Sequence, residues 1–167
     1  MLRSANQEWR KDLKEGDMID AISDENNNAR CSGWSQARIS SVTGDVLQLE
    51  YIFDVKSVDR YLDRWSVEIA PYQSKTKDIW EWRSTLQIGQ VVDAHDKSVW
   101  NKSTILDIKE QQISPTRVVK MAYIGYRVYT DNGTKSDEKG NFEGWSSKFD
   151  EWMALYSPRI QPFMTKS

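Results

Sequence analysis

The stretch EWRSTLQIGQVVDA at residues 81–94 decides the fold, because residues 8–21 repeat it as EWRKDLKEGDMIDA. Each copy opens on Glu-Trp-Arg, carries a Leu and a Gly at the same later positions, and closes on Asp-Ala. Trp9 and Trp82 define one offset that aligns all of these matches. Self-similarity at a constant offset is the sequence signature of a repeated structural unit. We therefore expect the chain to contain two copies of one fold.

The similarity extends beyond the opening blocks and predicts where each copy ends. Three further pairs of blocks match in the same order: WSQARI (34–39) with WNKSTI (100–105), VLQLEY (46–51) with VVKMAY (118–123), and LDRW (62–65) with FDEW (149–152). Both copies then end on Ile-x-Pro. A chain of 167 residues can hold two small domains. The blocks place these domains at residues 8–72 and 80–163.

Each copy has the pattern of short strands separated by turns. In residues 46–53, for example, alternate positions carry two leucines and a tyrosine, which is the period of a β-strand. Such strands at short spacing predict an all-β fold of two small antiparallel barrels. The polar insertions at 24–32 and 130–141 are predicted to be exposed loops. We expect residues 71–78 to link the two copies and residues 81–86 to form a short entry turn.

Composition excludes several classes of function. The formal net charge of -2 gives no whole-chain basic footprint for nucleic acid. Cys31 is the single cysteine and His95 the single histidine, so no internal disulfide and no zinc motif is present. No nucleophile with an adjacent base can be identified, which predicts that the chain is not an enzyme and requires no cofactor or metal. No apolar run reaches the length of a membrane span, so we expect no membrane partner.

The richest aromatic stretch is GWSSKFDEWMALY at residues 144–156. It contains four rings, those of Trp145, Phe149, Trp152 and Tyr156, with the carboxylates of Asp150 and Glu151 among them. Such a set of rings can hold an ammonium or guanidinium group through cation–π contacts of about 0.5–2 kcal/mol. The same rings can equally fill the core of a small β domain. The residues alone favour core packing and leave the cation-binding interpretation open.

The order of these motifs resembles that of the Tudor-like superfamily. The motifs are Gly-x-x-Val-Asp-Ala, Trp-x-x-Ser-x-Ile, Val-Val-x-Met-x-Tyr-x-Gly, Gly-Trp-Ser-Ser-Lys-Phe-Asp-Glu-Trp and Arg-Ile-x-Pro. They are similar to those of Tudor, MBT and chromo-barrel or Tudor-knot repeats of chromatin proteins. The resemblance implies tandem SH3-like barrels that read methylated lysine or arginine on histone tails or other proteins. The tandem arrangement also resembles modules of some protist ubiquitin hydrolases, which implies docking within a larger parent protein.

Carried onto this sequence, the resemblance implies an aromatic cage in the second copy. Its residues would be Trp100, Tyr123, Tyr126, Trp145 and Phe149, with Asp150 as the acidic residue at the rim. Tyr126 and Trp145 compete for one place in this cage. The first copy has no Gly-Trp before its Asp-x-Trp and is interpreted as mainly structural.

Two other binding functions stay open. Basic residues of the second copy could gather on one face for RNA or DNA, interleaved with tyrosines that stack on bases: these are Lys97, Lys102, Lys109, Arg117, Lys120 and Arg127. Alternatively, filled pockets would leave a scaffold that docks proteins through an exposed strand edge. The chain begins and ends in polar residues, so we expect it to be part of a longer protein. Its chromatin resemblance favours a nuclear location, with the cytoplasm as the alternative.

Overall fold

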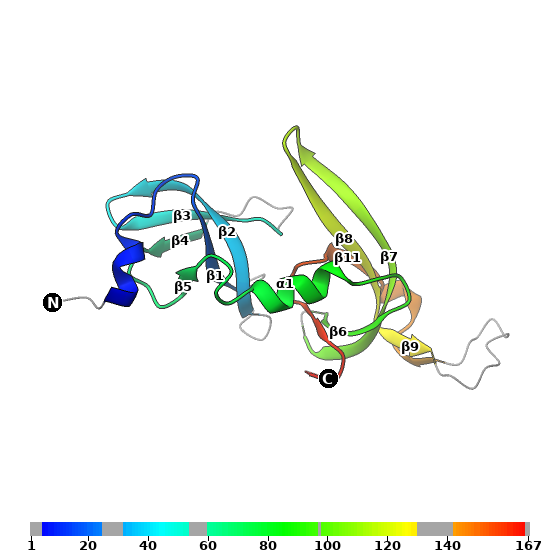
Figure 1. Cartoon of the computed structure of the whole chain (residues 1–167). Coiled ribbons are helices and arrows are strands. Elements are labelled where there is room, and N and C mark those ends of the chain that lie inside the picture. The colour runs from blue at the N-terminus through cyan, green and yellow to red at the C-terminus, as the bar shows by residue number, and fades with distance from the viewer. Residues whose placement is uncertain (1–4, 25–31, 54–59, 97, 130–141, 166–167) are drawn as a thin grey trace.

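The computed structural model describes residues 5–24, 32–53, 60–96, 98–129 and 142–165. Its strands form two five-stranded antiparallel sheets and one two-stranded ribbon (Figure 1). The only helices in the described residues are short. The prediction of an all-β fold built from two barrel-like antiparallel sheets is therefore confirmed.

The first sheet follows a short 3-10 helix, η1 (Ala5–Arg10). Its strands are β1 (Met18–Asp24), β2 (Ser32–Thr43), β3 (Val46–Tyr51), β4 (Arg60–Asp63) and β5 (Ile69–Pro71), in the order β4-β3-β2-β1-β5. Gly44 has φ of +61° in the turn between β2 and β3, a conformation that favours glycine. Alternate residues of β3 are buried, as the sequence pattern predicts.

The second sheet repeats this order. Its strands are β6 (Val91–His95), β7 (Trp100–Ser114), β8 (Arg117–Gly125), β11 (Glu151–Ala154) and β12 (Ile160–Pro162), in the order β11-β8-β7-β6-β12. The ribbon of β9 (Arg127–Tyr129) and β10 (Phe142–Gly144) and the 3-10 helix η4 (Ser147–Phe149) lie between β8 and β11 in the sequence. The insertion at 130–141 lies outside the described residues, and so does most of the insertion at 24–32.

The structure differs from the sequence-based expectation in one segment. The region between the copies contains an α-helix, α1 (Lys77–Ser84), where the sequence indicated a link followed by an entry turn. The side chain of Arg83 explains why this helix is held in place. It is 1% exposed and donates to the carbonyl oxygens of Tyr156 and Ile160 at 3.2 and 2.8 Å. Packing of the helix against the second sheet thus stabilises it in spite of its short length.

The two sheets share specific local geometry. Gly16 and Gly89 both have φ of +94°, and their N–H groups donate to the carbonyls of Ile39 and Ile105 at 2.8 and 2.7 Å. Each of these isoleucines precedes a register shift in its strand, after Ile39 in β2 and after Ile105 in β7. The repeated glycine therefore marks a repeated strand entry, which is the structural counterpart of the sequence duplication.

The strand registers correct two parts of the motif alignment, namely the matching of 46–51 with 118–123 and the matching of the two Asp-x-Trp motifs. Ile39 pairs with Leu49, which pairs with Arg60, whereas Ile105 pairs with Ile124, which pairs with Glu151. Arg60 is therefore the counterpart of Glu151. The two Asp-x-Trp motifs, which look equivalent in sequence, do not occupy equivalent positions in the sheets.

The two repeats share part of their apolar core. The first cluster is centred on β1, β2 and β3, but it also contains Val119 and Met121 of β8 and Ala154 of β11. Figure 1 shows the long β7–β8 hairpin rising from the second sheet beside the first. The second cluster contains Val92, Ile105, Ile124 and Ile160. Consequently, one face of β8 serves the first repeat and the other face serves the second.

Candidate functional site

Three aromatic rings of the predicted cage gather at the end of β8. The ring centroids of Tyr126 and Trp145 are 6.2 Å apart, and those of Trp145 and Phe149 are 4.9 Å apart in an edge-to-face arrangement. Tyr126 is buried, Trp145 is half-buried, and Phe149 is 44% exposed. We call these residues the ring cluster. Its burial decreases from Tyr126 outward, so the two outer rings are accessible to a ligand.

Local backbone geometry holds the ring cluster together. The N–H of Trp145 donates to the carbonyl of Tyr126 at 2.7 Å, just beyond the end of the β9–β10 ribbon. The one turn of η4 then carries the chain to Phe149, whose N–H donates to Ser146 O at 3.1 Å. The ribbon thus returns the chain to β8, and the short helix presents Phe149 beside Trp145.

Asp150 does not lie at an open rim. Its two carboxylate oxygens accept from Nη1 and Nη2 of Arg127 at 2.5 and 3.0 Å, and the side chains of Arg127 and Asp150 are only 8% and 5% exposed. This is a bidentate, charge-assisted pair of the kind that fixes geometry as well as charge. Because Arg127 already neutralises its charge, Asp150 is not an open acidic contact for a ligand.

Glu151 is the more accessible carboxylate, and sequence reasoning did not select it. Its Oε2 accepts from the hydroxyl of Tyr126 at 2.7 Å and lies 3.1 Å from Nη2 of Arg159, while its side chain is 33% exposed. Arg159 also donates to the backbone carbonyl of His95 at 2.8 Å. Burial, with a further contribution from Glu151, raises the pKa of Tyr126 far above its ordinary value. Tyr126 therefore stays protonated and donates to Glu151.

Trp100 lies at the same end of the sheet, beside His95. Its ring is 5.1 Å from the ring of His95, with which it pairs across β6 and β7. The hydroxyl of Tyr126 is 3.5 Å from the carbonyl oxygen of His95. Trp100 therefore contacts the ring of His95, and His95 in turn contacts Tyr126 through its backbone carbonyl.

Tyr123 is separated from the ring cluster. Tyr126, Ile124 and Ala122 belong to the second core cluster, and successive residues of a strand point to opposite faces. Tyr123 accordingly packs on Trp152, its partner in β11, with the ring centroids 5.0 Å apart. The structure thus brings Tyr126, Trp145 and Phe149 together, places Trp100 nearby, and puts Tyr123 on the other face.

The two repeats carry the same ion pair with exchanged charges. In the first repeat, Nη2 of Arg60 on β4 lies 3.4 Å from Oε1 of Glu68. In the second, the carboxylate of Glu151 is on the equivalent strand, and Arg159 supplies the cation. The sequence contained a signal for this exchange, because Glu68 and Arg159 both stand directly before Ile-x-Pro. At this position of the strand the first repeat therefore carries a cation and the second repeat a carboxylate.

A cation of the chain itself lies on the ring cluster. Nζ of Lys148 is 5.1 Å from the centroid of the Phe149 ring, within cation–π range. Lys148 is exposed, so this contact is made in solvent. An ammonium group therefore lies within cation–π range of the exposed Phe149 ring in this structure.

The basic residues considered for nucleic acid do not form one free face. Arg127 is in the buried pair with Asp150, and Arg117 lies 3.5 Å from Glu50 of the first repeat. Lys97 is outside the described residues. Among the described residues, no group of three or more His, Cys, Asp or Glu side chains could hold a metal ion. None of the helices described is long and apolar enough to cross a membrane.

Comparison with known proteins does not assign the chain to a family. No family model matches, and no curated protein matches the sequence. Among solved structures, the chain is similar to the four MBT repeats of Drosophila melanogaster Sfmbt, determined in complex with the peptide RHR (me)K VLR. The TM-score is 0.31 and the identity 11%, over 98% of this chain and 42% of that chain. This chain therefore spans less than half of that one, and so distant a similarity carries no inference about function.

Proposed function

We propose that the chain is a non-enzymatic recognition module whose ring cluster binds a methylated lysine side chain of another protein. The observation that carries this proposal is the accessible edge-to-face pair of Trp145 and Phe149, with the ammonium of Lys148 5.1 Å from the Phe149 centroid. Cages of aromatic rings recognise methylated ammonium groups because the ring faces attract the cation without hydrogen bonding to it. An incoming methylammonium would displace Lys148 from this face.

The charges around the ring cluster support a cationic ligand. Glu151 is part-exposed and anchored by Tyr126 and Arg159, so its carboxylate is held in a fixed place. Asp150 contributes indirectly, because its pair with Arg127 removes the positive charge that would otherwise repel a methylammonium. A methylated arginine is the less favoured ligand, because its planar guanidinium is best matched by a free bidentate carboxylate, and that of Asp150 is occupied.

The test is a titration of the chain with lysine peptides that carry zero, one, two or three methyl groups, followed by tryptophan fluorescence and calorimetry. We expect the methylated peptides to bind and Trp145→Ala to weaken them at least about tenfold, which corresponds to about 1.4 kcal/mol. Phe163→Ala is the matched control, because Phe163 is also an exposed ring with a lysine, Lys102, 6.0 Å from its centroid.

Two outcomes would overturn the proposal. Equal binding of methylated and unmethylated peptides would show that the rings do not select the methylammonium. Loss of binding in Trp145→Ala together with loss of folding would make Trp145 a core residue, and the urea unfolding curve of the variant separates these cases. Binding should weaken only modestly between low and moderate salt, because a single ammonium on aromatic rings releases none of the counterions that a row of phosphate contacts releases.

A further inference from the structure

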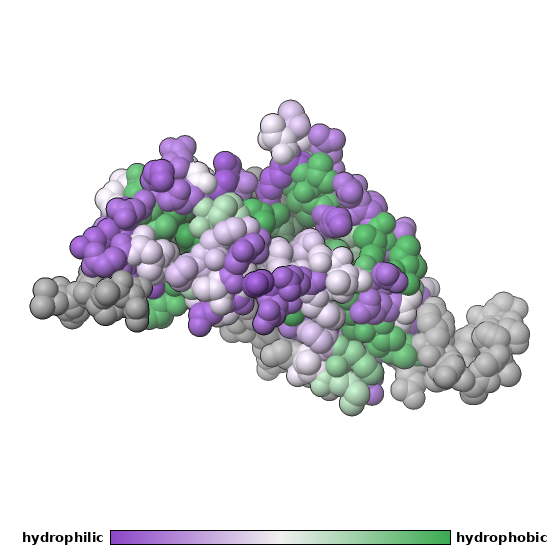
Figure 2. Space-filling view, in the orientation of Figure 1, coloured by the Kyte–Doolittle hydropathy of each residue, from purple (hydrophilic) through white to green (hydrophobic). Residues whose placement is uncertain are grey.

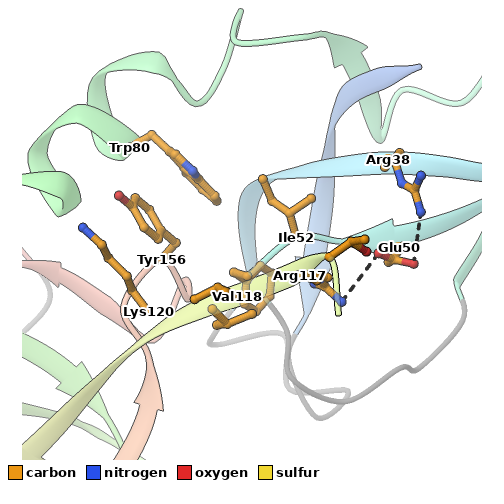
Figure 3. A pocket seen from close by; sticks show the side chains of 11 residues that line it. Arg38, Glu50, Ile52, Trp80, Arg117, Val118, Lys120 and Tyr156 are labelled. Atoms are coloured by element: carbon orange, nitrogen blue, oxygen red, sulfur yellow. Dashed lines mark ion pairs between the residues drawn. The ribbon is translucent and has the colours of Figure 1, made fainter. Parts of the chain in front are cut away.

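A second candidate site lies between the two repeats, away from the ring cluster. It is a pocket of about 560 Å³, within the size range of ligand-binding clefts. Its walls come from β3 of the first repeat, from α1, and from residues 116–120 of the β7–β8 hairpin. Figure 3 shows Trp80 and Tyr156 on one side, Ile52 on another, and Val118 between them.

The pocket contains a strand edge that no strand of the described residues covers. β11 pairs with β8 only as far as Met121, opposite Ala154. The chain then leaves β8, and the last bond between them runs from Leu155 N–H to Lys120 O at 2.9 Å. Every second residue of β8, counted from Lys120, directs its backbone N–H and C=O toward the β11 side, because the direction of these groups alternates along an antiparallel strand. Val118 therefore directs its N–H and C=O into the uncovered side.

The side chains around this edge combine apolar and ring surfaces. Trp80 and Tyr156 are stacked, with centroids 5.1 Å apart and planes at 26°, at the point where β11 ends. Val118 is 50% exposed although it lines the pocket, and Ile52 is half-buried. On the face seen in Figure 2, hydrophobic surface extends along the second repeat beside a more hydrophilic first repeat. An apolar side chain of a ligand would bury part of the pocket wall that Trp80, Tyr156 and Val118 form.

The charged residues of the pocket favour a ligand with negative charge. Three cationic residues, Arg38, Arg117 and Lys120, line it against one carboxylate, Glu50, which leaves a formal excess of positive charge. Glu50 is shared between Arg38 at 3.7 Å and Arg117 at 3.5 Å (Figure 3). Lys120 is exposed and has no ion pair among the described residues. A carboxylate of a ligand would form an ion pair with Lys120 and balance part of this positive charge.

We propose that this pocket binds an extended acidic peptide, which adds to the edge of β8 at Val118. Backbone hydrogen bonds would provide register, an apolar side chain would pack on Trp80 and Tyr156, and an acidic side chain would meet Lys120. This is recognition by strand addition, in which pockets beside the edge supply specificity. The site is independent of the ring cluster, which lies at the other end of β8.

The test uses fluorescein-labelled peptides in which glutamate alternates with valine, isoleucine, phenylalanine or tyrosine, and matched peptides with lysine in place of glutamate. Fluorescence anisotropy measures binding to the wild type and to Val118→Pro. Proline removes the N–H of the open edge but no bond of the β7–β8 ladder, so the fold should be retained. We expect glutamate peptides to bind the wild type and to bind Val118→Pro at least about tenfold more weakly.

Two controls keep the result specific. Val118→Ala shortens the same side chain but keeps the N–H, so it should bind much more tightly than Val118→Pro. Lys120→Glu should reverse the preference between glutamate and lysine peptides, and it gives a second test if the proline variant does not fold. Methylated-lysine binding at the ring cluster should be the same in Val118→Pro as in the wild type, which separates this proposal from the proposed function.

Several results would overturn the proposal. These are the absence of binding by every glutamate peptide, equal binding of glutamate and lysine peptides, and undiminished binding by a folded Val118→Pro. Displacement of the peptide by single-stranded RNA with a steep dependence on salt would assign the positive charges to nucleic acid instead.

Discussion

Replacing Asp150 by alanine removes one half of a buried ion pair and leaves the other half in place. The guanidinium of Arg127 is 8% exposed and makes two bonds to the carboxylate, at 2.5 and 3.0 Å. Removing one partner of such a pair costs about 3–5 kcal/mol, because the remaining charge stays buried without its carboxylate. We therefore expect Asp150→Ala to lower the free energy of unfolding by about that amount.

The assay is urea unfolding followed by far-UV circular dichroism. Arg127→Met should be destabilising as well, but the double variant Arg127→Met with Asp150→Leu should recover much of the loss, because apolar residues of similar volume often replace a buried pair without cost. The cycle of Arg127→Met, Asp150→Leu and their double variant isolates the coupling between the two residues. A coupling energy near zero would refute the reasoning.

This experiment also distinguishes two roles for Asp150. If Asp150 were an open acidic contact for a ligand, Asp150→Ala would weaken peptide binding and leave the unfolding curve unchanged. The geometry instead predicts a large change in stability, with any loss of binding following from displacement of the ring cluster.

Three further predictions follow from single contacts. Gly89→Ala should cost about 1 kcal/mol in urea unfolding, because a Cβ there meets no atom within 4 Å but φ is +94°, so the penalty is backbone strain alone; an unchanged midpoint would contradict this. Burial opposes ionisation of Asp96, yet hydrogen bonds from Val99 and Ser98 hold its pKa below the ordinary value. The stabilisation is present above the pKa of the unfolded chain and is lost as pH falls through the folded pKa, so Asp96→Asn should destabilise at pH 7 and match the wild type in strong acid. Arg83→Met should cost about 2–4 kcal/mol in thermal or urea unfolding, because it leaves the buried carbonyl oxygen of Ile160 and the part-buried one of Tyr156 without their donor; a cost below about 0.5 kcal/mol would contradict that.

The parts of the fold that could be predicted from sequence are those in which a residue type is required locally. Gly16 and Gly89 recur because the strand entry needs positive φ, and alternation along residues 46–53 indicates a strand directly. The matching of the two Asp-x-Trp motifs was wrong for the opposite reason. Identical letters carry no register, and the register of β4 and β11 is fixed by pairing with β3 and β8.

The candidate site was predictable only where its residues are neighbours in sequence. Trp145 and Phe149 lie four residues apart on one short turn, so their contact could be anticipated. The burial of Asp150 could not be predicted, because its partner Arg127 begins β9, on the far side of the insertion at 130–141 in the sequence. The placement of Tyr123 depended on which face of β8 meets which repeat, and that is a property of the whole pair of sheets.

The sharing of β8 between two cores has a consequence for how this chain can be divided. Val119 and Met121 are 3% and 5% exposed because they pack with the first repeat's core rather than with their own. Cutting the chain between the repeats would expose apolar surface on both halves, and each half would tend to aggregate.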